Sequence, residues 1–193
     1  AIDETHTHVV GRGGATGRFG LEPDIVTIGK SIAGGVPLGA YGLIESLAGE
    51  IDVTRSPAAA TGGTLFGNPL SMAAARATLT QVLTPEAYDH TAALGARLAD
   101  GIDKTIRACG LPWTAQRFGP RSGHWYGPEP ATGRQALDLR DPLLTTTQRI
   151  WMANRGVWEA LSGAGPTMAV PARESDADLY LDAYARFLRA VTA

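Results

Sequence analysis

An apolar run that closes on a lysine and then breaks into glycines constrains this chain more than any other feature. The run over residues 25–29 predicts a short buried strand, and Lys30 follows it directly. The stretch at residues 34–39, rich in glycine and proline, prevents the strand from continuing. A lysine among apolar residues costs free energy unless it is paired or used in chemistry, so we expect Lys30 to be buried and functional.

Arginine supplies almost every other positive charge in the chain. The sequence holds two lysines, Lys30 and Lys104, against fifteen arginines. A guanidinium cannot form an imine, whereas a desolvated lysine amine is the usual Schiff-base nucleophile. Lys30 is therefore the leading candidate catalytic residue. The alternative is a lysine that extends from a strand end to reach water.

Composition narrows the classes of partner. A hydrophobic content of 44% and a charged content of 19% are ordinary for a soluble globular protein. The net charge of −2 and the pI near 6.1 argue against nucleic acid as a partner. No apolar stretch reaches the ~20 residues that span a bilayer. The single cysteine, Cys109, excludes an internal disulfide and suits a reducing cytosol, so we expect a cytoplasmic protein.

Periodicity and turn signals divide the chain near residues 83–86. Residues 1–83 are rich in glycine and carry the candidate site, and residues 84–193 predict a smaller α+β lobe. Residues 9–20 and 127–140 predict connections without regular structure. The expected strands cover 25–28, 40–44, 113–118 and 122–126, and the expected helices cover a short turn near 47, 70–83, a stretch through 94–106 that ends near 110, 141–156, and 175 onwards.

Two chemical alternatives use the same residues. Gly29-Lys30-Ser31 ends like a phosphate-binding P-loop, but the pattern needs glycine at position 24, where Asp24 stands. His6 and His8 form a His-x-His pair that resembles the first-strand metal signature of amidohydrolase barrels. Such a barrel takes about 250 residues and further ligands on later strands. A metal-dependent hydrolase remains an alternative, and histidines that line a loop or cleft are the simpler interpretation.

Four motifs in chain order resemble a known family. They are Asp3-Glu4-Thr5, the segment 23–30, the segment 34–39 and the segment 62–70, which runs Gly-Gly-Thr-Leu-Phe-Gly-Asn-Pro-Leu. Together they resemble the class III pyridoxal-phosphate aminotransferases, most closely the branch that contains glutamate-1-semialdehyde aminomutase. The resemblance is specific over residues 1–80 and looser beyond. It implies a partial fold-type-I α/β architecture, with 1–83 as part of the large cofactor-binding domain plus an interdomain helix and 84–193 as the small C-terminal α+β domain.

The resemblance also implies roles for named residues. Lys30 would form the Schiff base with the aldehyde of pyridoxal 5'-phosphate and afterwards carry a proton. Asp3 would pair with the pyridine nitrogen, which deepens the electron sink. Thr64 would bind the cofactor phosphate across a homodimer interface, and Gly63 would let the backbone approach the phosphate closely. The implied reaction moves an amino group from a small-molecule donor to a keto or aldehyde acceptor, and an intramolecular aminomutase shift is the close variant.

Two departures from the family pattern qualify this interpretation. The usual wording after Asp-Glu is Val-x-Thr-Gly, whereas this chain has Thr5-His6-Thr7-His8. We therefore expect His6 or His8 to lie near the cofactor or the substrate entrance, and His6 is the candidate cofactor-binding residue of the two. Family members are roughly twice this long, given their two-lobed architecture. We accordingly expect an upstream half to be missing, and an inactive truncated fragment that still dimerises is a further alternative.

Overall fold

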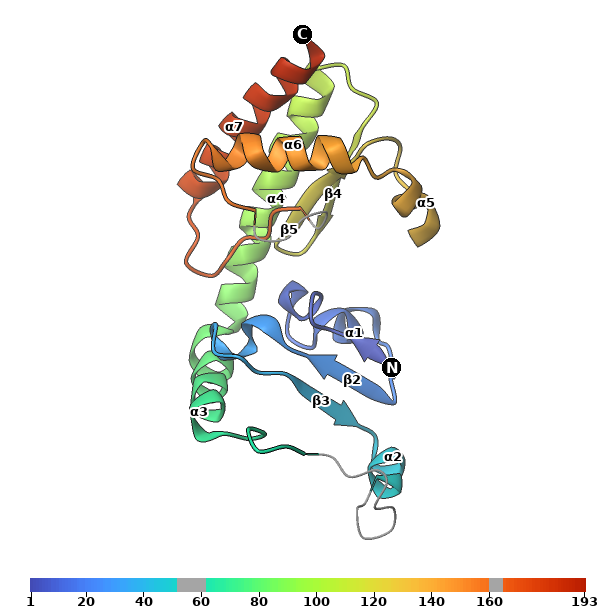
Figure 1. The fold of residues 1–193 in the computed structure, drawn as a ribbon, viewed down its shortest axis with the longest axis vertical. Coiled ribbons are helices and arrows are strands. Elements are labelled where there is room, and N and C mark those ends of the chain that lie inside the picture. Colours follow the sequence, from blue (N-terminus) through green and yellow to red (C-terminus); the bar gives the residue numbers. More distant parts are fainter. Residues whose placement is uncertain (52–61, 160–164) are drawn as a thin grey trace. The chain divides into compact units, whose positions relative to one another are not determined.

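The chain divides into two compact units, Ala1–Tyr88 and Asp89–Ala193, in a computed structural model. The structure describes residues 1–51, 62–159 and 165–193 (Figure 1). Thr61, the first residue of the predicted second glycine loop, lies outside these ranges. Within the described ranges, no helix has the length and apolar character needed to cross a bilayer.

A three-stranded mixed sheet forms the centre of the first unit. Its strands are β1 (Ile2–Asp3), β2 (Ile25–Ile28) and β3 (Ala40–Leu43), in the order β1-β2-β3. β1 runs parallel to β2, with Asp3 opposite Thr27, and β3 runs antiparallel to β2. The predicted strands at 25–28 and 40–44 are confirmed, and the turn of glycine and proline between them reverses the chain as expected.

Short helices fill the connections of the first unit. They are η1 (His8–Val10), α1 (Gly14–Phe19), η2 (Lys30–Ala33), α2 (Glu45–Glu50), α3 (Pro69–Ala77) and the π-helical turn η4 (Thr78–Val82). The prediction of an irregular loop at 9–20 is wrong, because α1 forms there between Gly13 and Gly20, both with left-handed backbones. α3 starts where predicted. The side chain of Asn68 accepts a hydrogen bond from the Ser71 N–H, and Pro69 follows it at the first helical position.

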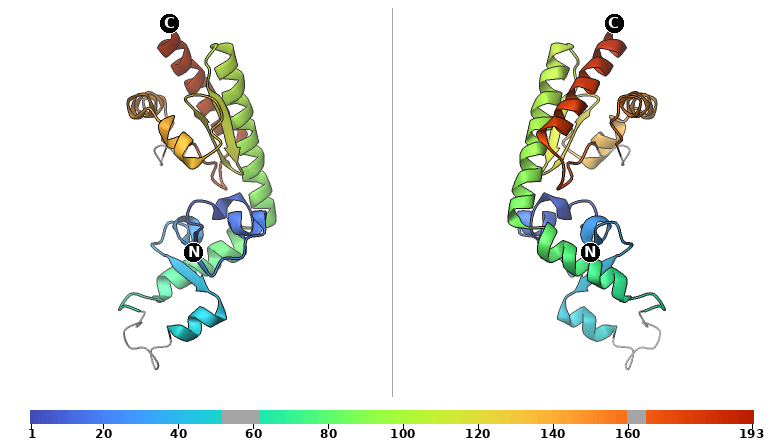
Figure 2. Two further views of the ribbon diagram at one scale, coloured as in Figure 1. Left: turned by 90° about the vertical axis from the view of Figure 1, so that its right-hand side faces the viewer. Right: turned by 90° about the vertical axis from the view of Figure 1, so that its left-hand side faces the viewer.

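The second unit packs three helices around one apolar core. α4 (Pro85–Ala108), which begins in the first unit, lies beside α7 (Glu174–Thr192), and α6 (Pro142–Ala153) packs on α7 (Figures 1 and 2). Leucine and isoleucine recur along one face of α4, as the four-residue spacing predicts. The fully buried members of the core are Leu98, Ile102, Ile106, Met152, Ala177, Ala183, Tyr184, Phe187 and Leu188.

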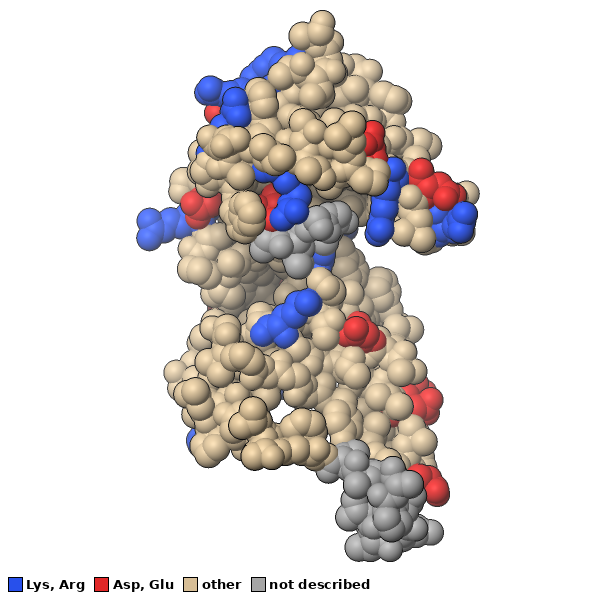
Figure 3. All heavy atoms as spheres, in the orientation of Figure 1, with Lys and Arg blue, Asp and Glu red and all other residues tan. Residues whose placement is uncertain are grey.

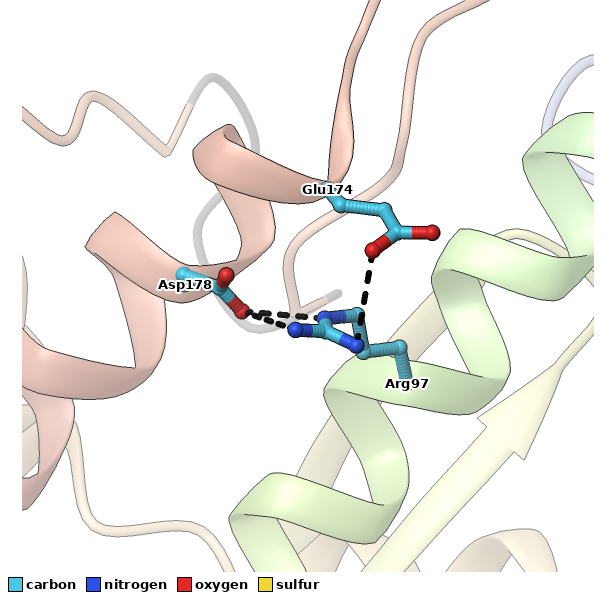
Figure 4. A network of polar contacts seen from close by, with 3 residues as sticks. All are labelled: Arg97, Glu174 and Asp178. Carbon is cyan, nitrogen blue, oxygen red and sulfur yellow. Dashed lines mark hydrogen bonds and ion pairs between the residues drawn. The ribbon is translucent and has the colours of Figure 1, made fainter.

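A β-hairpin completes the second unit. β4 (Thr114–Phe118) and β5 (Arg121–Trp125) pair antiparallel, which confirms the two predicted strands. The connection predicted without regular structure at 127–140 contains the short helix α5 (Gly133–Asp138), whose N-cap Thr132 accepts a hydrogen bond from the Gln135 N–H. Arg97 on α4 contacts both Asp178 and Glu174 on α7 (Figure 4), with 2.8 Å between Arg97 and Asp178. These side chains are substantially exposed, so the ion pairs add little to the packing between the helices.

Candidate functional site

Two parallel strands bring Asp3 and Lys30 to the same edge of the sheet. Asp3 ends β1, and Lys30 comes two residues after the end of β2. Asp3 pairs with Thr27, three residues before Lys30, so the two residues come at the same end of neighbouring strands. The carboxyl ends of parallel strands are where ligand-binding residues gather in α/β sheets.

Asp3 is held as a carboxylate by its neighbours. The Thr5 N–H donates to Asp3 Oδ1 at 2.8 Å. This backbone hydrogen bond is the largest cause that lowers the pKa of Asp3, and the Thr5 hydroxyl, the Thr27 hydroxyl and the charge of His6 lower it further. His6 therefore lies within electrostatic reach of Asp3. A carboxylate that stays ionised is the chemical requirement for pairing with a protonated ring nitrogen.

Lys30 is exposed in this chain, so the expectation of a buried amine is wrong. The physical reason is the turn that begins at this residue. η2 starts at Lys30 and points Ile32 and Ala33 inward, leaving them 3% and 1% exposed, while the lysine faces outward. Lys30 is also the one non-glycine residue with a left-handed backbone among those the structure describes, with φ at 57°. Such strain in a residue with a side chain often marks a functional position.

Gly63 and Thr64 lie in a separate turn that leads into α3. Both are exposed, and the turn is closed by a hydrogen bond from the Phe66 N–H to the Gly63 carbonyl. Within the described residues, no hydrogen bond joins this turn to Asp3 or Lys30 directly. The link is indirect: the Ser71 hydroxyl near the start of α3 donates to the Pro37 carbonyl at 3.0 Å, and α3 packs on η2. The predicted roles of Gly63 and Thr64 stay predictions.

Glu4 is a structural carboxylate that the sequence did not reveal. Its side chain is 2% exposed and accepts hydrogen bonds from the Ala15 N–H at 3.1 Å, from both the N–H and the hydroxyl of Thr16, and from the Thr7 hydroxyl. Burial raises the pKa of Glu4, but the hydrogen bonds from Thr16 and Thr7 outweigh it, and the pKa falls below its usual value. Its backbone donors lie eleven and twelve residues further along the chain, so no local pattern marks it.

Both ring nitrogens of His8 are engaged in hydrogen bonds. Nδ1 lies 2.8 Å from the Glu4 backbone oxygen, and Nε2 lies 2.7 Å from the Ser31 hydroxyl oxygen. A metal ligand needs a free ring nitrogen, so this arrangement disfavours the hydrolase alternative. Among the described residues, no three side chains of histidine, cysteine, aspartate or glutamate gather as a metal site would require.

A cavity of the first unit lies on the face of the sheet away from the Asp3 side. It measures about 530 Å³, and Val26 and Ile28 line it together with Ile32, Leu79 and Leu83. Side chains alternate along a strand, so Thr27, between Val26 and Ile28, faces the other side, where its hydroxyl meets Asp3. The cavity and the Asp3–Lys30 edge are thus two different features of this unit.

The second unit contains a partly buried histidine, His124, to which the sequence analysis assigned no role. The Tyr184 hydroxyl and His124 Nδ1 are 3.1 Å apart, and the imidazole stacks on Trp113 at 5.1 Å between ring centroids. Burial lowers the pKa of His124 to about 4, so the ring is neutral at pH 7. The histidine belongs to the packing of the hairpin against α7.

Comparison with known proteins identifies the family of this chain. The sequence model of the family described as Aminotransferase class-III matches residues 1–108. Glutamate-1-semialdehyde 2,1-aminomutase of Bacillus subtilis is 40% identical over 148 residues, which cover 75% of this chain and 33% of that protein. This chain thus spans about a third of the length of that curated relative.

Solved structures agree with the sequence comparison. A glutamate-1-semialdehyde aminomutase from Pseudomonas aeruginosa superposes with a TM-score of 0.88 at 34% identity, covering 97% of this chain and 44% of that one. A transaminase solved with PLP bound gives a TM-score of 0.82 at 26% identity, covering 98% and 43%. The predicted fold class, a partial fold-type-I α/β architecture, is confirmed. The chain belongs to the class III aminotransferase family.

Proposed function

We propose that this chain carries the lysine of a pyridoxal-phosphate-dependent enzyme that moves an amino group from a small-molecule donor to a keto or aldehyde acceptor. The observation that carries the proposal is the position of an ionised Asp3 and a conformationally strained Lys30 at the carboxyl ends of two neighbouring parallel strands. Family membership and the transaminase solved with PLP support the choice of cofactor.

The residues present fit this cofactor by their chemistry. The Asp3 carboxylate would hold a proton on a ring nitrogen, and its low pKa suits that task. The Lys30 amine would hold the aldehyde carbon covalently and, once released, move a proton at the substrate α-carbon. The Thr64 hydroxyl and the Gly63 backbone would bind the phosphate, and His6 would lie close to Asp3. When bound, the cofactor supplies an electron sink for negative charge on the substrate carbon.

A homodimer with a shared site would reconcile this role with the exposure of Lys30. An amine works as a nucleophile at neutral pH only when its pKa is lowered, and desolvation is the usual means. In the single chain, the Lys30 side chain is exposed to water. A partner subunit that covers the Asp3–Lys30 edge and contributes Thr64 would remove that water. A cytoplasmic location is part of the same proposal and rests on the single Cys109.

An intramolecular amino shift is the second candidate reaction. It is favoured by the aminomutases that resemble this chain, at 40% identity in sequence and with a TM-score of 0.88 in structure. The same Lys30 and Asp3 would serve both reactions. Product analysis separates them, because an aminomutase converts one substrate into its isomer, whereas a transaminase converts an amino donor and a carbonyl acceptor into two products.

The test traps the cofactor on the lysine. The chain is incubated with pyridoxal phosphate, reduced with borohydride and digested, and the labelled peptide is identified by mass. We expect the label on Lys30 and its complete loss in Lys30→Arg, which keeps the charge but cannot form an imine. Lys104→Ala is the matched control, since Lys104 is the second lysine and is exposed on α4. Equal labelling of the two lysines in the unsubstituted chain would refute the proposal and favour the inactive-fragment alternative.

A further inference from the structure

The imidazole of His8 connects the loop after β1 to the first turn of η2. Its Nδ1 lies 2.8 Å from the Glu4 carbonyl oxygen, and its Nε2 lies 2.7 Å from the Ser31 hydroxyl. A backbone carbonyl can only accept, so Nδ1 carries the hydrogen and Nε2 of the neutral ring is an acceptor. In this tautomer the Ser31 hydroxyl donates to Nε2.

Both ends of this connection are anchored. On one side, the Glu4 N–H donates to the Thr27 carbonyl at 2.8 Å, and the Glu4 side chain is buried beneath the start of α1. On the other side, the Ser31 carbonyl accepts the Gly34 N–H at 3.1 Å, which closes the turn of η2. His8 thus connects two fixed segments, the one at Glu4 and the one at Ser31, which directly follows Lys30.

The backbone of Lys30 needs such support. A left-handed conformation is unfavourable for any residue with a β-carbon and persists only where the surroundings hold it. The residue before it, Gly29, is fully extended and buried, and a β-carbon added there would lie 3.5 Å from Thr5 Cγ2. The residue after it, Ser31, is the one that His8 holds.

We infer that His8 is a positioning residue, which acts through Ser31 to hold the Lys30 backbone in its left-handed conformation and so to aim the amine. The inference rests on the proposed function for its chemical meaning. It concerns a feature of this chain in particular, because His8 stands at the glycine of the family wording Asp-Glu-Val-x-Thr-Gly.

Amide hydrogen exchange tests whether the connection holds the backbone. In the full chain without cofactor, His8→Phe and Ser31→Ala should each speed exchange of the Gly34 amide about fivefold, the factor that one hydrogen bond of ordinary net strength contributes. The double variant should show the same fivefold change, not the product of about 25, because both substitutions remove one interaction. His8→Gln keeps an acceptor and Ser31→Thr keeps the hydroxyl, so both should exchange like the unsubstituted chain. Unchanged exchange in the single variants, or multiplied effects in the double variant, would overturn the inference.

Lysine labelling tests whether the connection aims the amine. Pyridoxal phosphate and borohydride are applied to each variant, and the label on Lys30 is divided by the label on Lys104, which serves as an internal standard. The ratio should fall about fivefold in His8→Phe and Ser31→Ala and recover in His8→Gln and Ser31→Thr. Faster exchange at Gly34 with an unchanged ratio would overturn the positioning role.

The two measurements separate this inference from the proposed function. An unsubstituted chain that labels both lysines equally would remove the proposed function. The exchange rates at Gly34 would then still decide whether His8 holds the Lys30 backbone, because that measurement uses no cofactor.

Discussion

At the scale of a single residue, the Glu4 side chain holds α1 and Thr7 of the first unit through hydrogen bonds. A buried carboxylate is stable only when its charge is matched by hydrogen-bond donors, and Glu4 finds them at the start of α1 and on Thr7. The close approach requires a residue without a side chain at Gly14. A β-carbon added there would lie 2.3 Å from Glu4 Oε2.

Gly14→Ala should therefore destabilise the chain far more than Gly20→Ala. Both glycines have left-handed backbones, with φ at 63° and 60°, so both substitutions pay a conformational cost of about 1 kcal/mol. Only Gly14→Ala also displaces the Glu4 carboxylate, which adds roughly 2 to 3 kcal/mol. Urea denaturation followed by circular dichroism compares the two variants. Equal losses of stability would show that Glu4 moves aside freely.

The lowered pKa of His124 predicts that the protein loses stability in acid. The pKa of His124 in the folded chain is about 4, below its ordinary value of 6.5. His124 of the unfolded chain therefore binds a proton at a higher pH than His124 of the folded chain. The contribution of neutral His124 to the free energy of unfolding is complete above pH 6.5 and declines as the pH falls toward 4. The decline should be on the order of 2 kcal/mol. Denaturation at pH 7 and pH 4.5 should show a smaller pH effect in His124→Phe than in the unsubstituted chain. The control is the exposed His90→Phe, which should keep the full effect.

At the scale of elements, two glycines on α4 let neighbouring elements approach the helix. A β-carbon at Gly95 would lie 2.4 Å from the Gly119 carbonyl oxygen in the hairpin turn, and one at Gly101 would lie 2.4 Å from Leu181 Cδ1 on α7. The obstacle is backbone in the first case and the tip of a flexible side chain in the second. The Ser122 hydroxyl also donates to the Gly95 carbonyl at 2.9 Å, which ties the hairpin to this point of α4.

Gly95→Ala should consequently cost several kcal/mol, whereas Gly101→Ala should change the free energy of unfolding by less than about 1.5 kcal/mol. Alanine favours a helix over glycine by about 1 kcal/mol at either position, so this gain cancels in the comparison. Thermal melts of the two variants provide the measurement. A Gly95→Ala variant as stable as Gly101→Ala would mean that the hairpin shifts without loss.

The same elements show how far the sequence could be interpreted. The strands of the first unit and the long helices were predictable because periodicity and turn residues mark them locally, as Asn68-Pro69 marks α3. α1 was missed because its sequence, Gly-Ala-Thr-Gly-Arg-Phe, has weak helix propensity and its stability comes from the distant Glu4. Asp3 and Lys30 follow neighbouring parallel strands, and their joint role in a cofactor site stays a prediction. The sequence left open whether Lys30 is buried or reaches water, because the outcome depends on the direction of the first turn after β2.

At the scale of the whole molecule, large apolar side chains near Thr64 are exposed in this chain. Leu65, Phe66 and Leu70 are 77%, 72% and 70% exposed. Figure 3 shows few charged side chains among the described residues on the drawn face of the first unit. Exposed apolar clusters of this kind mark interaction surfaces. They adjoin the residue proposed to serve a partner's site, which agrees with a homodimer whose sites are shared.

Mixing two defective variants tests the sharing directly. Lys30→Ala lacks the amine, and Thr64→Val lacks the proposed phosphate hydroxyl, so neither homodimer should trap low concentrations of pyridoxal phosphate. If Thr64 serves the partner's lysine, a mixed dimer regains one intact site, and random exchange restores about a quarter of the sites of the unsubstituted protein. The readout is the borohydride-trapped label on Lys30 after the variants exchange subunits. Mixing Thr64→Val with the double variant Lys30→Ala/Thr64→Val restores none and serves as the control. No recovery in the first mixture would assign Thr64 to its own subunit or to no site at all.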